Sequence, residues 1–208
     1  MTSFIPCICS VLILTITSVH VVKGGSSGGT VYTRWGRKDC PGSAKLIYSG
    51  FAGGSYYTHK GAAVDPLCLP TDPQWGSHNS WKDGHRGLLY GAEYKGVPSD
   101  FVSHLVDHDV PCAVCETVGE KSVIVIPART SCYSGWKTEY SGYLMSGNYD
   151  YEAGSVYSCV DRYPQTVIGG SPRKNGYLFY LVEGRCGSLK CPPYMDGWEI
   201  TCVVCSKA

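Results

Sequence analysis

Eight cysteines form two series with the same spacing, and this repeat restricts the possible folds more than any other feature of the sequence. Each series has two single cysteines followed by a Cys-x-x-Cys pair. The second series follows the first at offsets of 92, 91 and 90 residues, the members being Cys40, Cys68, Cys112 and Cys115, then Cys132, Cys159, Cys202 and Cys205. A nearly constant offset across several landmarks indicates an internal duplication.

The residues around these cysteines repeat as well. Cys40 and Cys132 are each followed by Lys and then by Tyr-Ser-Gly at the same distances, and Leu88-Leu89-Tyr90 matches Leu178-Phe179-Tyr180. We therefore predict two homologous halves, residues 30–118 and 119–208. The strand-like run Ser122–Ile126 follows Cys115 too closely to leave room for a flexible linker, so we expect the halves to pack rigidly against each other.

Strand-forming residues interrupted by glycine and proline predict an all-β fold. The chain has 26 Gly and 16 Tyr, and no window sustains the 3.6-residue period of a helix. The predicted architecture is two tandem homologous, disulfide-linked β-rich subdomains packed together. Asn175-Gly176, directly before a strand, suggests a hairpin turn. Besides Ser122–Ile126, the predicted strands are Leu46–Tyr48, Gly87–Tyr90, Tyr177–Val182 and Ile200–Cys205.

Residues 1–24 have the composition of a secretory signal peptide, with an apolar run from Phe4 to Val22. Small or β-branched residues before the boundary predict cleavage after Gly24, and cleavage after Ser18 is the main alternative. An uncleaved membrane anchor is the competing interpretation, because the run is nearly long enough to span a bilayer. Residues 25–29 would then form a Gly/Ser-rich leader, and we expect a secreted, extracellular protein.

The charge of the mature chain is balanced. Loss of residues 1–24 removes Lys23 and leaves 17 basic and 17 acidic side chains. There is no basic surplus to attract nucleic acid or a membrane surface, and no acidic surplus of the kind that gathers calcium. We therefore expect neither nucleic acid nor, after signal cleavage, a membrane as a partner, whereas neutrality permits close self-association.

Two of the 12 cysteines, Cys7 and Cys9, fall inside the predicted signal, which leaves ten. An even number in an exported chain predicts a disulfide framework. The two Cys-x-x-Cys pairs would suit zinc in a cytosolic protein, but oxidation is favoured behind a signal sequence. A redox-active pair is less favoured still, because it requires a thiol at a helix N-terminus and these pairs lie in strand-like segments.

His104 and His108 are the weak candidates for a metal site. Four residues apart, they would share one face of a helix and present two imidazole ligands. The alternative is a surface loop that leads into the strand containing Cys112. We expect no bound metal and no cofactor.

We expect no enzymatic activity, because the chain has no Gly-x-Ser-x-Gly elbow and no motif with paired carboxylates. Four aromatic residues are candidates for a surface that binds a sugar or a protein, although core or interface packing is the more common role of such residues. They are Tyr56, Tyr57, Trp75 and Trp81.

Six longer motifs carry a resemblance to a known family. The chain resembles the C-terminal domain of short-chain sponge collagens (spongin-like proteins), and the match spans nearly the whole mature chain. That domain in turn is similar to the C-terminal non-collagenous domain of type IV collagen. The motifs are Arg34–Pro41, Gly53–His59, Asp65–Pro70, Val110–Cys115, Ala128–Cys132 and Glu183–Ser188.

The resemblance implies a disulfide pairing. Each subdomain of the type IV collagen domain has six cysteines, paired first with sixth, second with fifth and third with fourth. The second half of this chain has all six, and the first half lacks the third and fourth. The implied pairs are Cys40–Cys115, Cys68–Cys112, Cys132–Cys205, Cys159–Cys202 and Cys186–Cys191.

The chain departs from the collagens in one respect, because it contains no Gly-X-Y run and so has no segment able to form a triple helix. The resemblance then implies a collagen-type terminal domain that acts in the extracellular matrix or an organic skeleton, with itself or other matrix proteins as partners. The alternative is a soluble extracellular module that binds a carbohydrate or protein ligand.

Overall fold

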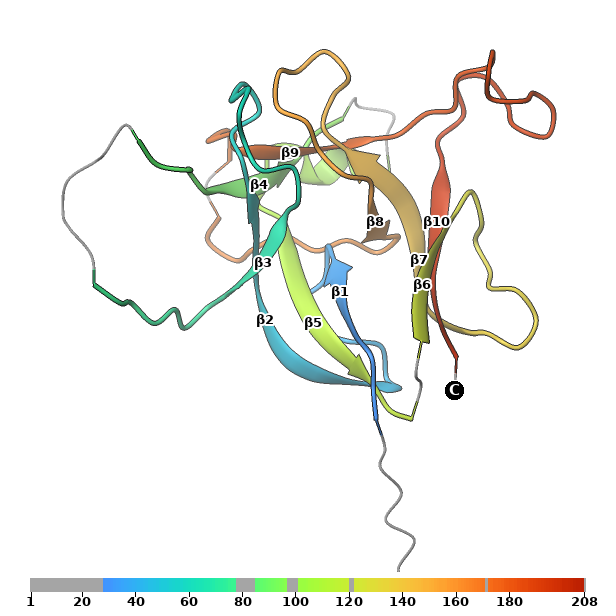
Figure 1. Ribbon diagram of the computed structural model, residues 1–208, viewed down its shortest axis with the longest axis horizontal. Helices are drawn as coiled ribbons and strands as arrows, with labels where there is room; N and C mark the ends of the chain where they lie inside the picture. Colours follow the sequence, from blue (N-terminus) through green and yellow to red (C-terminus); the bar gives the residue numbers. More distant parts are fainter. Residues whose placement is uncertain (1–27, 78–84, 97–100, 120–121, 171, 208) are drawn as a thin grey trace, which may run out of the picture.

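Strands dominate the computed structural model, which describes residues 28–77, 85–96, 101–119, 122–170 and 172–207 (Figure 1). The described residues include one short 3-10 helix, η1, at Ser103–Leu105. The all-β prediction is therefore confirmed, while residues 1–24 and most of the 25–29 leader lie outside the described part. The strands are β1 (Val31–Trp35), β2 (Ala44–Gly54), β3 (Leu67–Pro70), β4 (Tyr90–Tyr94), β5 (Pro111–Thr117), β6 (Ser122–Pro127), β7 (Lys137–Ser146), β8 (Ser158–Asp161), β9 (Tyr177–Leu181) and β10 (Thr201–Lys207).

The strand pairings of the first half recur in the second. In the first half, β5 pairs with β1 and β2, and β2 also pairs with β3 and β4. In the second half, β10 pairs with β6 and β7, and β7 also pairs with β8 and β9. All of these pairings are antiparallel.

A β-bulge recurs at equivalent positions. The register between β2 and β5 shifts at Ile47, and the register between β7 and β10 shifts at Glu139, which is 92 residues further along the chain. An extra residue in one strand bends it locally, so both long strands curve at the same point.

The two halves nevertheless share one mixed sheet. Its order is β6-β10-β7-β8-β1-β5-β2-β4-β9, with β3 beside β2. Two parallel pairings join the halves, β1 with β8 and β4 with β9, and β9 also pairs with β7, so that the sheet returns on itself. Since strands of both halves contribute to one sheet, the division into two packed subdomains stays a prediction.

The described residues contain five disulfides, and each of them joins two segments of the same half. They join Cys40–Cys115, Cys68–Cys112, Cys132–Cys205, Cys159–Cys202 and Cys186–Cys191, the same pairs as the resemblance implies. Equivalent bonds span 75 and 73 residues, and 44 and 43 residues. The fifth closes a short loop between β9 and β10 and occurs in the second half alone.

The apolar core passes through both halves. One buried cluster packs Val110 and Tyr94 against Met145, Val160 and Phe179. A second cluster contains Tyr32, Tyr140, Val204 and half-cystines of both repeats. Neither half buries its apolar surface alone, because each cluster takes residues from both.

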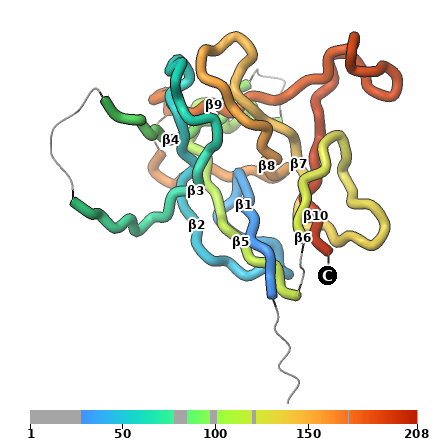
Figure 2. The backbone as a smooth tube through the Cα atoms, viewed as in Figure 1, coloured from blue at the N-terminus to red at the C-terminus, as the bar shows by residue number. Residues whose placement is uncertain are grey.

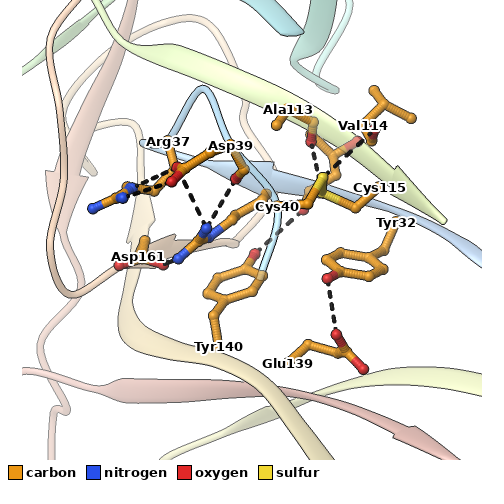
Figure 3. Close-up of a disulfide and its surroundings, with 12 residues drawn as sticks. Tyr32, Arg37, Asp39, Cys40, Ala113, Val114, Cys115, Glu139, Tyr140 and Asp161 are labelled. Carbon is orange, nitrogen blue, oxygen red and sulfur yellow. Dashed lines mark hydrogen bonds and ion pairs between the residues drawn. A yellow bond between two sulfur atoms is a disulfide. The ribbon is translucent and has the colours of Figure 1, made fainter. Parts of the chain in front are cut away.

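A nearly buried ion pair also joins the halves. On β1, Nε of Arg34 donates to Oδ2 of Asp161 on β8 at 2.9 Å, and Nη2 lies 2.6 Å from the same oxygen. Nearby, the Tyr140 hydroxyl donates to the carbonyl of Cys159, and the Tyr32 hydroxyl donates to Glu139. Figure 3 shows Asp161, Tyr140 and the contact of Tyr32 with Glu139 beside the Cys40–Cys115 disulfide. These contacts set the relative position of β1 and β8.

Two local predictions are wrong. Gly87–Leu89 is not a strand, because β4 begins at Tyr90, where pairing with Gly54 starts, and both leucines before it are exposed. Asn175 and Gly176 have positive φ and Gly176 lies at a bend, but they form neither a hydrogen-bonded turn nor a hairpin, because β9 pairs with β4 and β7. The other four predicted strands lie within β2, β6, β9 and β10, apart from one residue at the end of Tyr177–Val182 and one at the start of Ile200–Cys205.

The ion pair between the halves gives a first prediction. Asp161→Ala removes the buried carboxylate partner of the Arg34 guanidinium and leaves it the longer, 3.5 Å ion pair with the exposed Asp39, so we expect the free energy of unfolding to fall by about 3 kcal/mol. Urea unfolding at pH 7 measures this change. Asp150→Ala, at an exposed loop position, is the matched control and should lose less than about 0.5 kcal/mol. Equal losses in the two variants would contradict the assigned role.

A second prediction compares two disulfides of the second half, each removed as a pair. Cys159→Ala with Cys202→Ala opens a loop of 43 residues at a buried position and should lower the free energy of unfolding by about 4 kcal/mol. Cys186→Ala with Cys191→Ala opens a 5-residue span near the surface, and about 2 kcal/mol or less is expected. Unfolding of both variants in urea is the measurement, and the reverse order would show that the short loop stabilises the fold by other contacts.

Candidate functional site

Five tyrosine rings lie in one continuous row across the junction of the halves. The ring centroids of Tyr90 and Tyr56 are 5.0 Å apart, those of Tyr56 and Tyr57 4.8 Å, those of Tyr57 and Tyr151 4.7 Å, and those of Tyr151 and Tyr180 5.8 Å. Tyr90 and Tyr180 occupy equivalent positions at the two ends, since Tyr90 pairs with the last residue of β2 and Tyr180 with the last residue of β7. We call these five residues the tyrosine row.

Two equivalent loops position the row. The loop after β2 carries Tyr56 and Tyr57, and the loop after β7 carries Tyr151; the two loops lie side by side in Figure 2. The amide of Ala153 donates to the carbonyl of Tyr57 at 3.1 Å, and Lys60 forms an ion pair with Glu152. The hydroxyls of Tyr151 and Tyr180 are hydrogen-bonded at 2.9 Å. Each loop therefore holds the other in place.

A groove of about 920 Å³ opens beside the second-half end of this row. Its walls are the 146–157 segment, the end of β9 with the residues that follow it, and the segment before β10. Tyr151 and Tyr180 line it together with Tyr149 and Tyr157, which are 98% and 69% exposed. A concave surface with aromatic walls and polar groups is the usual form of a small-ligand site.

The polar groups of the groove come from both sides. Glu183 and Arg185 form an ion pair at 2.7 Å, and Glu199 lines the same wall. Ser155 accepts a hydrogen bond from the amide of Gly147 at 2.7 Å, which shapes the opposite wall. Burial raises the pKa of Tyr180, and its hydrogen bond to Tyr151 raises it further, so this phenol is neutral at ordinary pH.

Of the aromatic residues suggested by the sequence, the structure brings Tyr56 and Tyr57 together and leaves Trp75 apart. Trp75 is exposed and has no part in the ring contacts of the described residues. Trp81 lies outside the described residues. Sequence reasoning missed the 146–157 segment, although its clustered Tyr and Gly residues were a visible signal.

His104 and His108 do not share a helix face, which corrects that expectation. Only Ser103–Leu105 is helical, and Val106 leaves the helix with extended backbone angles. Both side chains are exposed, as in the surface-loop alternative, and His108 uses Nδ1 in a 3.0 Å contact with the carbonyl of Val106. Within the described part of the chain, no group of three or more potential ligands could hold a metal ion.

The neighbouring residue Asp107 holds the halves together instead. It forms ion pairs with Lys95 and with Arg173 of the second half, the latter at 3.0 Å. Lys95 also lies 2.9 Å from buried Glu93, whose other oxygen accepts hydrogen bonds from the amides of Lys174 and Asn175. The hydrogen bond from Lys95 lowers the pKa of Asp107 below its ordinary value.

Two strand edges are open in the described structure. β6 pairs with β10 alone, and β3 pairs with β2 alone. β6 exposes Ile124 and Val125, and β3 exposes Leu67. Unpaired backbone groups beside exposed apolar side chains are able to accept another strand.

Comparison of the chain with protein-family models gives no match, and comparison with curated proteins gives none either. Among the described residues, no helix is long and apolar enough to cross a membrane. The resemblance to the sponge collagen domain therefore stays a prediction.

A third prediction concerns pH. Because Asp107 has a lower pKa folded than unfolded, its ion pairs stabilise the protein above about pH 4, and this contribution is lost as the pH falls further. Asp107→Asn should lower the stability at pH 7 by about 1 kcal/mol and reduce the difference between pH 7 and pH 3. Asparagine tolerates the positive φ at this position, so the backbone is preserved.

Urea unfolding of both proteins at pH 7 and pH 3 measures the effect, with Asp150→Asn as the control. An unchanged difference in stability between the two pH values in Asp107→Asn would contradict the role given to this carboxylate. Asp39, whose pKa is lowered by hydrogen bonds from Arg37, should retain its own share of the acid sensitivity.

Proposed function

We propose that this protein is a secreted structural component of an extracellular matrix or organic skeleton, which acts by self-association. Five disulfides are typical of proteins that work in an oxidising environment outside the cytosol. The signal-like residues 1–24 and the resemblance to collagen-type terminal domains favour the same location. Other matrix proteins are the further partners that this proposal allows.

One observation carries the proposal. The repeat provides two equivalent pairs of strands that could join the halves, but in the described structure only one of these pairs is in contact. β1 of the first half pairs in parallel with β8 of the second, with Trp35 opposite Val160. The equivalent strands are β6 and β3, and the two edges left open in the described structure are the edges of these strands. Figure 1 shows β3 and β6 on opposite sides of β1. A second copy of the chain would supply each with its partner.

Non-equivalent disulfides of the two halves also meet at the junction. The buried cluster at the junction contains Cys115 of the first half, with its partner Cys40 packed against it. From the second half it contains Cys159 and Cys202, and these two disulfides are not equivalent in the repeat. Opposite, non-equivalent sides of the repeat therefore meet. An interface of this heterologous kind leaves two complementary sides free and propagates into a ring or a filament.

The open edges have apolar residues at the positions of the internal ion pair. The repeat offset puts Ile126 where the first half has Arg34, and Pro70 where the second half has Asp161. In the proposed contact between two copies, Ile126 and Pro70 would therefore take the places of Arg34 and Asp161. Burial of Ile124, Val125 and Leu67 would add to the backbone hydrogen bonds of an added strand.

Two complementary variants test this interface. Ile124→Lys places a charge on the β6 edge, and Leu67→Lys places one on the β3 edge. Sedimentation velocity at micromolar concentrations should show oligomers of the unmodified mature protein and monomers of each variant alone. An equimolar mixture of the two should form a heterodimer and nothing larger, because one intact β6 and one intact β3 remain.

Ile168→Lys is the matched control, since Ile168 is 87% exposed and lies on no strand, and its oligomers should be unchanged. An unmodified protein that stays monomeric over the whole concentration range would reject self-association and favour the soluble binding module. Oligomers that persist in both lysine variants would reject the β6–β3 interface.

A further inference from the structure

We propose that the groove beside the tyrosine row binds a neutral oligosaccharide of hexose or N-acetylhexosamine units. Nothing in the self-association of the strand edges requires this groove. Its four tyrosines, its size and the charges of its wall together favour a sugar chain over the other classes of small ligand.

The size of the groove fits a few sugar rings. Its volume of about 920 Å³ lies near the upper end of the roughly 300–1,000 Å³ of typical ligand sites. It runs along the 146–157 segment to the end of β9, so it is bounded by two elements that the tyrosine row holds together.

Two of its tyrosines are fixed and two are displayed. The mutual hydrogen bond of Tyr151 and Tyr180, and the ring of Tyr57 against Tyr151, hold the inner rings in place. Tyr149 and Tyr157 are largely exposed to solvent. A tyrosine offers a large apolar face with a polar tip, and the C–H faces of a pyranose ring are apolar while its edge carries hydroxyls. Such rings can therefore contact a sugar face and also hydrogen-bond to its edge.

Charged and amide groups supply the remaining recognition. Glu183 and Glu199 offer carboxylate acceptors for sugar hydroxyls, and Arg185 and the Asn148 amide offer donors. With two carboxylates and one guanidinium, the wall has a negative balance. A sulfated or uronic-acid chain would be repelled, whereas a neutral chain is not. The same balance disfavours a free phosphate or an acidic peptide.

Isothermal titration of the Ile124→Lys variant with defined hexamers tests the proposal. This variant is expected to be monomeric, so a failure of sugar binding can be distinguished from a failure of self-association. The probes are cellohexaose and the N-acetylglucosamine hexamer, with heparin as the anionic comparison. We expect saturable binding of at least one neutral hexamer and no binding of heparin.

Tyr149→Ala and Tyr157→Ala should each weaken the binding of that hexamer about threefold to tenfold, because each removes one exposed ring face. Tyr163→Ala is the matched control, since Tyr163 is 68% exposed and does not line the groove, and its affinity should be unchanged. Neither ring is part of the core, so the urea midpoints of all three variants should equal that of the parent.

Three outcomes would overturn the proposal. The first is the absence of saturable binding of both neutral hexamers at millimolar concentration. The second is heparin binding tighter than either hexamer, which would assign the surface to anionic chains. The third is an affinity that survives in the Tyr149→Ala, Tyr157→Ala double variant or falls equally in Tyr163→Ala, which would locate the sugar elsewhere.

Discussion

The alternation of side chains along a strand makes the Cys-x-x-Cys pairs the centre of this fold. Residues three apart on a strand point to opposite faces, so Cys112 and Cys115 are directed away from each other. Each must bond to a different segment, and the two disulfides attach Cys68 on one face of β5 and Cys40 on the other. The same arrangement around β10 attaches Cys159 and Cys132. Each half is thereby fastened through its central strand on both faces.

The features predicted from the sequence are those that a local pattern or the repeat determines. The all-β class follows from strand-forming residues separated by turns, and the strands at Ser122–Pro127 and Thr201–Lys207 are strongly β-branched. The parallel pairings of β1 with β8 and β4 with β9 were beyond such reasoning, because they join segments far apart in sequence and depend on how the halves dock. The start of β4 was misplaced for the same reason, since Leu88 and Leu89 have strand-like composition without a strand to pair with.

The candidate site was predicted in part for related reasons. Tyr56 and Tyr57 were visible as an aromatic pair, but the rings that complete the row come from the other half. The charged residues near the junction had no local signal either. Asp107 stood between two histidines that suggested a metal, whereas its partners Lys95 and Arg173 are known only from the folded arrangement. Polar groups that hold two repeats together can be identified only from their neighbours in the folded structure, because composition alone does not reveal them.

The two equivalent loops differ in what they contact, and this difference accounts for the groove beside one of them. The loops after β2 and β7 occupy equivalent places in the repeat, yet they have different surroundings. Tyr56 and Tyr57 pack between Tyr90 and Tyr151, so the first-half loop supports the second-half loop. Because Tyr151 is held in place by the first-half loop, the second-half loop can expose Tyr149 and Tyr157 and would lose little conformational entropy on binding a ligand. The same pair of repeats thus leaves two strand edges unpaired in the described structure and opens a groove beside one of two equivalent loops.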